Sequence, residues 1–254
     1  MKALELIDAS TFDFVEKPTP EPGPDDLLIR VKACGICGSD IHGMDGSSGR
    51  RIPPIVMGHE ASGVVEQCGA NIRAWSEGDR VTFDSTIYCG ECDYCKSGHV
   101  NLCEDREVLG VSTPDFRRQG AFADYVVVPG RICHRVPESV SYEEAAFAEP
   151  VSVALHAVRR AQIQAGDSAV VVGAGLIGLL VVQGLKRAGC KTIIAIDLAD
   201  ERLELALQLG ATAGLRSDRD AVVGEVQKLT GGEGADVVME VVGINPTVTL
   251  AINC

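Results

Sequence analysis

Four cysteines lie close enough together in the sequence to bind one metal ion. They follow the spacing C-x2-C-x2-C-x7-C within fifteen residues: Cys89, Cys92, Cys95 and Cys103. Four thiolates with no open coordination position are typical of a structural zinc ion. An iron–sulfur cluster is one alternative, because the first three cysteines have a ferredoxin-like spacing, and four unrelated buried thiols are another. Since Cys103 lies too far along the chain for a ferredoxin and Glu104 rather than proline follows it, we predict zinc.

A second set of metal-ligand types comes from three separate segments. Residues 34–42 (CGICGSDIH) are followed by Gly58-His59-Glu60 and, much later, by Ala148-Glu149-Pro150. A thiolate, an imidazole and a carboxylate can bind zinc and leave one position open for water or substrate. Such an ion makes an alcohol easier to deprotonate, which favours the loss of a hydride from it. The sequence therefore also predicts a catalytic zinc site.

Polar residues beside these ligand types suggest a route for the alcohol proton. Ser39 and His42 lie two and five residues after Cys37, and we predict that they relay the proton to water. We also expect the Asp40 carboxylate to fix the tautomer of His59.

Residues 173–178 have the glycine pattern of a dinucleotide-binding loop. Gly173, Gly175 and Gly178 fit G-x-G-x-x-G between a predicted strand and a predicted helix, and Asp197 ends the next predicted strand. The glycines let the backbone approach a pyrophosphate, and the Asp197 carboxylate can bind both ribose hydroxyls. A 2′-phosphate would meet like charge there, so the sequence favours NAD over NADP. The alternative is a tight turn that binds no ligand.

The elements that must position these residues follow from the hydrophobic pattern. The first part of the chain is rich in glycine, proline and cysteine, with short β-branched segments at 27–31, 61–65 and 125–128, which indicates an irregular β domain. An alanine-rich helical pattern covers 142–162. Predicted strands at 169–172, 192–196 and 235–242 then alternate with predicted helices at 176–187, 201–209 and 220–229. We therefore predict an α/β fold with a zinc-binding domain at 1–150 and a nucleotide-binding domain at 151–254.

Composition excludes several other classes of protein. The chain has 254 residues, a formal net charge of −13 and 46% hydrophobic residues, so it can bury a core but lacks the positive surface that nucleic acids and anionic membranes require. Residues 168–185 are uncharged, yet their four glycines fit a buried strand–turn–helix better than a membrane span. Ten cysteines without a signal peptide indicate a reducing compartment, and we expect a cytoplasmic protein.

Taken together, these motifs resemble those of the zinc-dependent medium-chain dehydrogenases, most closely the polyol branch that includes sorbitol and L-iditol dehydrogenases. The resemblance extends over essentially all 254 residues. It implies a GroES-like β-rich catalytic domain joined to a Rossmann domain, with NAD and two zinc ions per chain, one catalytic and one structural. It also implies a small alcohol or polyol as substrate and a homodimer or homotetramer for the full-length protein. Relative to the family the chain lacks a C-terminal part, so we expect an incomplete Rossmann domain.

The same resemblance implies roles for single residues. Cys37 and His59 would bind the catalytic zinc ion, and either Glu60 or Glu149 would complete its ligands, with Glu149 also a candidate catalytic residue. The four cysteines at 89–103 would hold the structural zinc ion. Ile177, Asp197 and Arg202 match positions that contact the cofactor, whereas Gly43 replaces a tyrosine that some animal sorbitol dehydrogenases direct toward the substrate.

The function expected from these observations is the oxidation of a secondary alcohol of a polyol, such as sorbitol or iditol, to a ketose with NAD. L-threonine 3-dehydrogenase and 2,3-butanediol dehydrogenase share the motifs and remain alternatives. A zinc- and nucleotide-binding protein without catalysis is the alternative from a different class.

Overall fold

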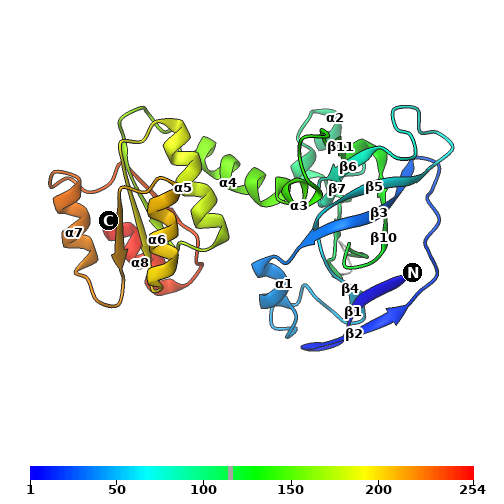
Figure 1. The fold of residues 1–254 in the computed structure, drawn as a ribbon, viewed down its shortest axis with the longest axis horizontal. Coiled ribbons are helices and arrows are strands. Elements are labelled where there is room, and N and C mark those ends of the chain that lie inside the picture. The colour runs from blue at the N-terminus through cyan, green and yellow to red at the C-terminus, as the bar shows by residue number, and fades with distance from the viewer. Residues whose placement is uncertain (114–116) are drawn as a thin grey trace. The chain divides into compact units, whose positions relative to one another are not determined.

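The structure, a computed structural model, describes residues 1–113 and 117–254. The chain divides into two compact units, Met1–Glu149 and Pro150–Cys254, which run from blue to green and from green to red in Figure 1. Within the described residues, no helix has the length and apolar composition that crossing a lipid bilayer would require.

A five-stranded antiparallel sheet forms the centre of the first unit. Alternate residues of its strands, such as Leu27 and Ile29 or Val126 and Val128, pack into one apolar cluster, as the period of two in a strand requires. The strand order is β10-β3-β5-β6-β11, with bounds Tyr125–Pro129, Asp26–Gly35, Glu60–Cys68, Arg80–Phe83 and Cys133–Arg135. The long β3–β5 pair gives a firm base for the segments that leave β3 and enter β5.

Smaller elements surround this sheet in the first unit. One three-stranded sheet has the order β2-β1-β4, at Thr11–Glu16, Lys2–Asp8 and Ile55–Val56. Another has the order β7-β8-β9, at Thr86–Ile87, Glu107–Leu109 and Arg117–Arg118. Short helices are α1 (Gly38–Gly43), α2 (Asp93–Lys96) and α3 (Tyr142–Ala146), with 3₁₀ turns at Val100–Leu102 and Gly130–Ile132. The longer α4 (Ala148–Arg160) begins at the end of this unit, and its residues from Pro150 onward belong to the second unit.

The second unit is a parallel sheet between layers of helices. Its strand order is β14-β13-β12-β15, at Ala213–Arg216, Thr192–Asp197, Ser168–Val172 and Val237–Glu240. The helices are α5 (Leu176–Ala188), α6 (Asp200–Leu209), α7 (Val222–Leu229) and α8 (Asn245–Asn253). This is the order 3-2-1-4 of a doubly wound nucleotide-binding sheet, in which the direction of winding changes beside the first strand.

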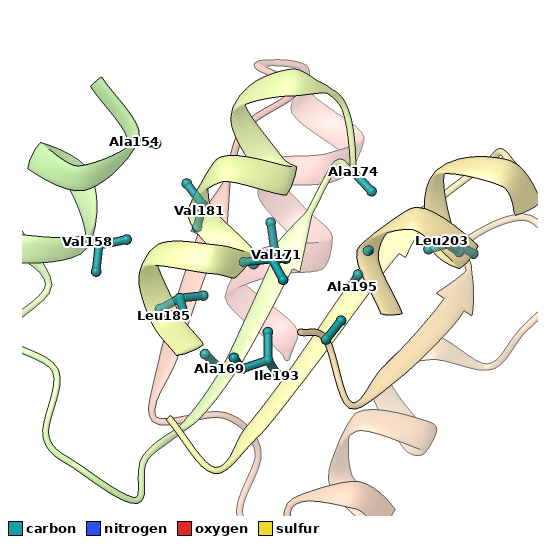
Figure 2. Packing of buried hydrophobic residues seen from close by; sticks show 13 residues of the cluster. Ala154, Val158, Ala169, Val171, Ala174, Val181, Leu185, Ile193, Ala195 and Leu203 are labelled. Carbon is teal, nitrogen blue, oxygen red and sulfur yellow. The ribbon is translucent and has the colours of Figure 1, made fainter. Parts of the chain in front are cut away.

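Both faces of this sheet are buried. Ala169 and Val171 of β12 pack with Val181 and Leu185 of α5 and Leu203 of α6 on one face, as Figure 2 shows. On the other face, the intervening residues of β12 and β13 pack against α7 and α8. Burial on two sides explains why these strands are continuous apolar runs rather than alternating ones.

The predicted fold class is confirmed, with differences in single elements. The helical pattern at 142–162 is divided into α3 and α4, because Pro150 has no backbone N–H to continue the hydrogen bonding of α3. The strand predicted at 235–242 covers only Val237–Glu240. Neither β14 nor α8 was predicted, since β14 contains Ala213 and Gly214 in place of β-branched residues, and α8 begins beside Pro246.

The glycine loop after β12 depends on close packing. Gly173 has φ of +101°, a conformation that other residues rarely adopt, and a Cβ atom on Gly178 would lie 1.8 Å from the Gly173 carbonyl oxygen. Gly178 therefore lets the first turn of α5 lie directly against the loop. A Cβ atom on Gly175, the residue before α5, would meet nothing within 4 Å.

We expect Gly178→Ala to destabilise the protein by about 2 kcal/mol or more, because α5 must move away from the loop to admit the methyl group. Thermal unfolding followed by circular dichroism measures this change. Gly224→Ala on α7 is the matched control: a Cβ atom there meets nothing within 4 Å, and the exchange should be neutral or stabilising by up to about 1 kcal/mol. Equal effects of the two exchanges would contradict the packing argument.

A carboxylate at the end of β13 fixes the same loop. Asp197 Oδ2 accepts a hydrogen bond from Ala174 N at 2.8 Å, and Oδ1 accepts from Leu198 N at 2.8 Å and Ala199 N at 3.0 Å. Burial alone would raise the pKa of Asp197, but these backbone donors outweigh it and lower the pKa below its usual value. Asp197 thus ties the loop after β12 to the segment after β13.

This lowered pKa predicts a loss of stability in acid. The contribution of Asp197 is complete above the unfolded-state pKa of about 3.9 and disappears as the pH falls through the lower folded-state value. At pH 7 we expect Asp197→Asn to cost about 1–3 kcal/mol, because the amide NH2 group cannot accept the loop N–H groups. Unfolding at a series of pH values should show the difference from wild type shrinking below about pH 4. Glu204→Gln, at an exposed position of α6, is the control for loss of one charge. An unchanged midpoint for Asp197→Asn at pH 7 would contradict the prediction.

Candidate functional site

The four cysteines at 89–103 form one compact cluster. Their sulfur atoms all lie within 4.8 Å of one another, and the Cys89 and Cys95 sulfurs are 3.9 Å apart. Sulfurs at the corners of a zinc tetrahedron with bonds of about 2.3 Å are separated by about 3.8 Å. The cluster therefore has the size for a single zinc ion, and it leaves no space for a cluster of several iron atoms.

Backbone donors prepare this cluster for a cation. Glu91 N and Cys92 N donate to Cys89 Sγ at 3.3 and 3.4 Å, and they lower the pKa of that thiol. The backbone N–H groups of Glu104 and Cys95 lower the pKa of Cys92 to about 6. Burial and the neighbouring thiols raise the pKa of Cys95 to about 12, because closely spaced thiolates repel one another. A divalent cation removes that repulsion and allows all four to ionise.

A second group of metal-ligand atoms brings together Cys37, His59 and Glu60. One ligand atom from each of these residues lies within 4.8 Å of the others. Cys37 directly precedes α1, and Glu60 is the first residue of β5. His59 and Glu60 are only 9% and 3% exposed, so both side chains are held within the protein. Glu149 does not belong to this group.

Two glycines allow close packing in and beside this group. Gly35, the last residue of β3, pairs with Glu60, and a Cβ atom on it would lie 2.4 Å from Glu60 Oε2. Gly58 has φ of +92°, and a Cβ atom there would lie 2.6 Å from the Phe122 ring. The segment before Glu60 is further fixed because Phe122 N donates to the Met57 carbonyl oxygen at 2.8 Å.

Asp40 lies behind this group in the first unit. Its Oδ2 accepts from Cys37 N at 3.1 Å, and its Oδ1 lies 3.6 Å from His59 Nδ1 and 3.3 Å from Arg51 Nη2. Burial opposes ionisation of Asp40, but His59, the Cys37 N–H group and Arg51 outweigh burial and lower its pKa. Burial likewise lowers the pKa of His59, yet Asp40 and Cys37 raise it to about 10. The surroundings of His59 thus favour positive charge, which a bound divalent cation also supplies.

His59 is one of the residues that line a cavity of about 720 Å³. Three further predicted residues, Ser39, His42 and Glu149, line the same cavity. Burial raises the pKa of Glu149; His59 opposes this effect, and nearby carboxylates such as Glu60 add to it. Ser39 Oγ contacts Arg51 Nη2 at 3.4 Å, and within the described contacts no hydrogen bond joins it to His42. The structure therefore places the predicted relay residues in one cavity without a direct link between them.

Arg51 was not predicted as part of the site. It is 4% exposed, contacts Asp40 and Ser39, and lines the cavity together with Arg50 and Arg106. The sequence contains a weak signal for it, an Arg-Arg pair shortly before Gly58-His59-Glu60 in an acidic chain.

Three of the six predicted cofactor residues line a cavity of about 360 Å³ in the second unit, whereas Gly175, Ile177 and Gly178 are not among its lining residues. Gly173, Asp197 and Arg202 line it, and Arg202 Nη1 is 3.5 Å from Asp197 Oδ1. Ile177 instead packs against the apolar cluster beneath α5, while Gly175 precedes that helix. The cavity lies at the carboxyl ends of β12 and β13, the edge of a parallel sheet where nucleotides bind.

Comparison with known proteins agrees with this geometry. The alcohol dehydrogenase GroES-like domain family matches residues 23–138, and the zinc-binding dehydrogenase family matches residues 177–254. D-xylulose reductase A of Aspergillus niger is 38% identical over 248 residues, which cover 94% of this chain and 68% of that protein. Sorbitol dehydrogenase of Bacillus subtilis (strain 168) is 36% identical over 249 residues, covering 97% of this chain and 69% of that protein.

A solved structure from Sinorhizobium meliloti 1021 with bound NADP superposes with a TM-score of 0.90 at 38% identity, covering 99% of this chain and 72% of that one. The four sulfurs lie within 4.8 Å of one another, a spacing that fits one zinc ion better than an iron–sulfur cluster. The chain is an oxidoreductase that uses zinc and a nicotinamide dinucleotide, and it belongs to the zinc-dependent medium-chain alcohol dehydrogenases, in their polyol dehydrogenase branch.

Proposed function

We propose that the protein oxidises a secondary hydroxyl group of a polyol to a ketone, with NAD as hydride acceptor. In this reaction the alcohol and NAD⁺ give the ketone, NADH and one proton. The observation that carries the proposal is the group of Cys37, His59 and Glu60 beside a cavity lined by Ser39, His42 and Glu149. A thiolate, an imidazole and one carboxylate are the ligand types of a catalytic zinc ion that keeps an open position.

We assign the catalytic zinc ion to Cys37, His59 and Glu60, and the structural zinc ion to the four clustered cysteines. Zinc at the first site supplies a Lewis acid that makes the substrate hydroxyl more acidic. Asp40 orients the His59 ring from behind, and Gly35 keeps the space that the Glu60 carboxylate occupies. Glu149 stays outside the ligand set and faces the substrate.

The proton of the hydroxyl group needs a path to water. Ser39 Oγ lines the cavity and can accept this proton while it donates its own, and the exposed His42 can pass it to solvent. Because no direct hydrogen bond joins the two side chains in the described contacts, the path includes the substrate or a water molecule between them.

The polyol assignment is supported by the chemistry of the cavity and by the relatives. Ser39, Ser48 and Ser85 are among the residues that line the cavity, and serine hydroxyl groups suit a substrate with several hydroxyl groups. Two relatives described above are named for sorbitol and D-xylulose. Steady-state rates with sorbitol, L-threonine and 2,3-butanediol, each with NAD, test the proposal. A higher kcat/KM for threonine or butanediol would replace the polyol assignment, and no NAD reduction with any alcohol would reject it.

The two glutamates should differ in their effect on zinc. We expect Glu60→Gln to lose the catalytic zinc ion, so that zinc per chain falls from about two to about one. Glu149→Gln should keep both ions and lose activity by about tenfold or more, because Glu149 lines the cavity outside the proposed ligand set. Elemental analysis after gel filtration measures the zinc. If Glu149→Gln loses zinc and Glu60→Gln keeps it, the ligand assignment is wrong.

Asp197 should determine the choice between NAD and NADP. Its carboxylate lines the nucleotide cavity and would repel a 2′-phosphate, whereas the nearby Arg202 would attract one. We expect Asp197→Ser to shift the ratio of kcat/KM for NADP to that for NAD upward by about tenfold or more. Asp200→Ser, at the start of α6 and outside the cavity lining, is the control. A wild-type protein that prefers NADP would overturn the assignment of NAD.

A further inference from the structure

The wall of the catalytic cavity differs in charge from the rest of the chain. The sequence contains 36 acidic and 23 basic residues, yet the described lining of the cavity contains Arg50, Arg51 and Arg106 against one carboxylate, that of Glu149. The other nearby acidic groups already have partners. Glu60 is assigned to the metal ion, and Asp40 contacts both Arg51 and His59.

The buried guanidinium of Arg51 has too few acceptors. Its Nη2 lies 3.3 Å from Asp40 Oδ1 and 3.4 Å from Ser39 Oγ, and its Nη1 lies 3.4 Å from the Arg50 carbonyl oxygen. All three contacts are at the long limit for a hydrogen bond, and Nε has no partner among the described residues. A guanidinium has five N–H groups, so donors remain for an acceptor that enters the cavity.

The fold makes specific room for this side chain. A Cβ atom on Gly43 would lie 2.7 Å from Arg51 Cγ, so the absence of a side chain at Gly43 lets Arg51 reach the cavity wall. Thr113 Oγ1, another atom of the lining residues, is also buried without a partner within the described part of the chain. Unpaired polar atoms in a buried wall are costly unless a ligand satisfies them.

Arg50 adds a positive charge beside these donors. Its backbone is held because its carbonyl oxygen accepts from Ser112 N at 3.2 Å, while its side chain is exposed and has no carboxylate partner among the described residues. Arg106 is engaged elsewhere, since its Nη1 donates to the Cys103 carbonyl oxygen at 2.9 Å, and it is not needed here.

We infer that the substrate carries an oxyanion, a carboxylate or a phosphate monoester, on the same carbon chain as the hydroxyl group that is oxidised, and that Arg50 and Arg51 bind it. The inference rests on the proposed function, because it takes this cavity as the substrate site. Planar guanidinium groups pair with carboxylate and phosphate oxygens through two parallel hydrogen bonds, which a neutral polyol cannot match in charge. The sugar acids and the polyol phosphates are thus the substrate classes that fit this wall.

Three compounds that share a six-carbon chain test the inferred oxyanion site: D-sorbitol, D-sorbitol 6-phosphate and D-gluconate. We expect kcat/KM for one of the two anions to exceed that for sorbitol by about tenfold or more, and the better anion identifies the oxyanion. The KM for that anion should rise between about 0.02 and about 0.3 M salt, because salt screens its attraction to the arginines, whereas the KM for sorbitol should not.

Variants of the two arginines test whether they cause the preference for an anionic substrate. Arg50→Gln and Arg51→Lys should each lower the preference for the anion over sorbitol by about tenfold, since one removes a charge and the other removes the planar fork. Arg73→Gln is the matched control, because Arg73 is exposed in the same unit, lies outside the cavity lining and donates only to backbone carbonyl groups. It should leave the preference unchanged.

Binding measured by calorimetry without NAD separates this inference from the proposed function. If sorbitol is oxidised at least as well as both anions and binds as tightly, the inference is wrong and the proposed function stands. If no compound is oxidised, the proposed function fails, and the binding data alone test the oxyanion site. An anion that binds more tightly than sorbitol, and more weakly to Arg50→Gln than to wild type, supports that site. Equal binding of all three compounds overturns it.

Discussion

The catalytic region depends on one buried carboxylate, that of Asp40. It is 2% exposed, and it contacts three segments that are separate in the sequence: the Cys37 N–H group, the His59 ring and the Arg51 guanidinium. A buried charge persists only when its partners offset the loss of hydration. Here each partner gains from the arrangement, because Cys37 and His59 are positioned for a metal ion and Arg51 is drawn into the wall.

A nearly buried aspartate also fixes loop backbone in the second unit. Asp197, also nearly buried, accepts three backbone N–H groups from two loops and has Arg202 at 3.5 Å. In both units an aspartate accepts backbone N–H groups and also lies beside a basic side chain, His59 and Arg51 for Asp40 and Arg202 for Asp197. Loops fixed in this way need little reordering when a metal ion or nucleotide binds, which favours tight binding.

The features that could be predicted from the sequence are those that a short local motif specifies. The four cysteines and the glycine loop each lie within a short segment, so their spacing alone indicated zinc and a dinucleotide, and the apolar runs indicated the parallel sheet. The choice between Glu60 and Glu149 could not be made in this way. Our assignment of Glu60 rests on the pairing of β3 with β5, which sets Glu60 beside Gly35 and close to Cys37.

The role of Arg51 in the cavity wall could not be predicted from the sequence for a related reason. Nothing in the sequence shows that its side chain folds over Gly43, because that contact depends on the path of an irregular segment between α1 and β4. Propensity also failed at β14 and α8, where packing on the sheet overrides the low strand and helix preferences of the residues. Regular elements with strong periodicity were predictable, whereas single contacts between loops were not.

The site therefore separates two kinds of residue by their surroundings. The proposed ligand set of Cys37, His59 and Glu60 lies at the end of β3 and the start of β5, beside Gly35, where a Cβ atom would meet the Glu60 carboxylate, so we expect exchanges there to act on the fold as well as on the proposed metal site. The segment that carries Ser48 and Arg50 is exposed, and its side chains can change without disturbing the ligands. Arg51 belongs to both groups, because it contacts Asp40 on one side and the cavity on the other. If Arg51 binds the substrate as proposed, an exchange there should change substrate preference and also remove a partner of Asp40, the carboxylate beside His59. We therefore expect the specificity of this wall to vary more readily through Arg50 than through Arg51.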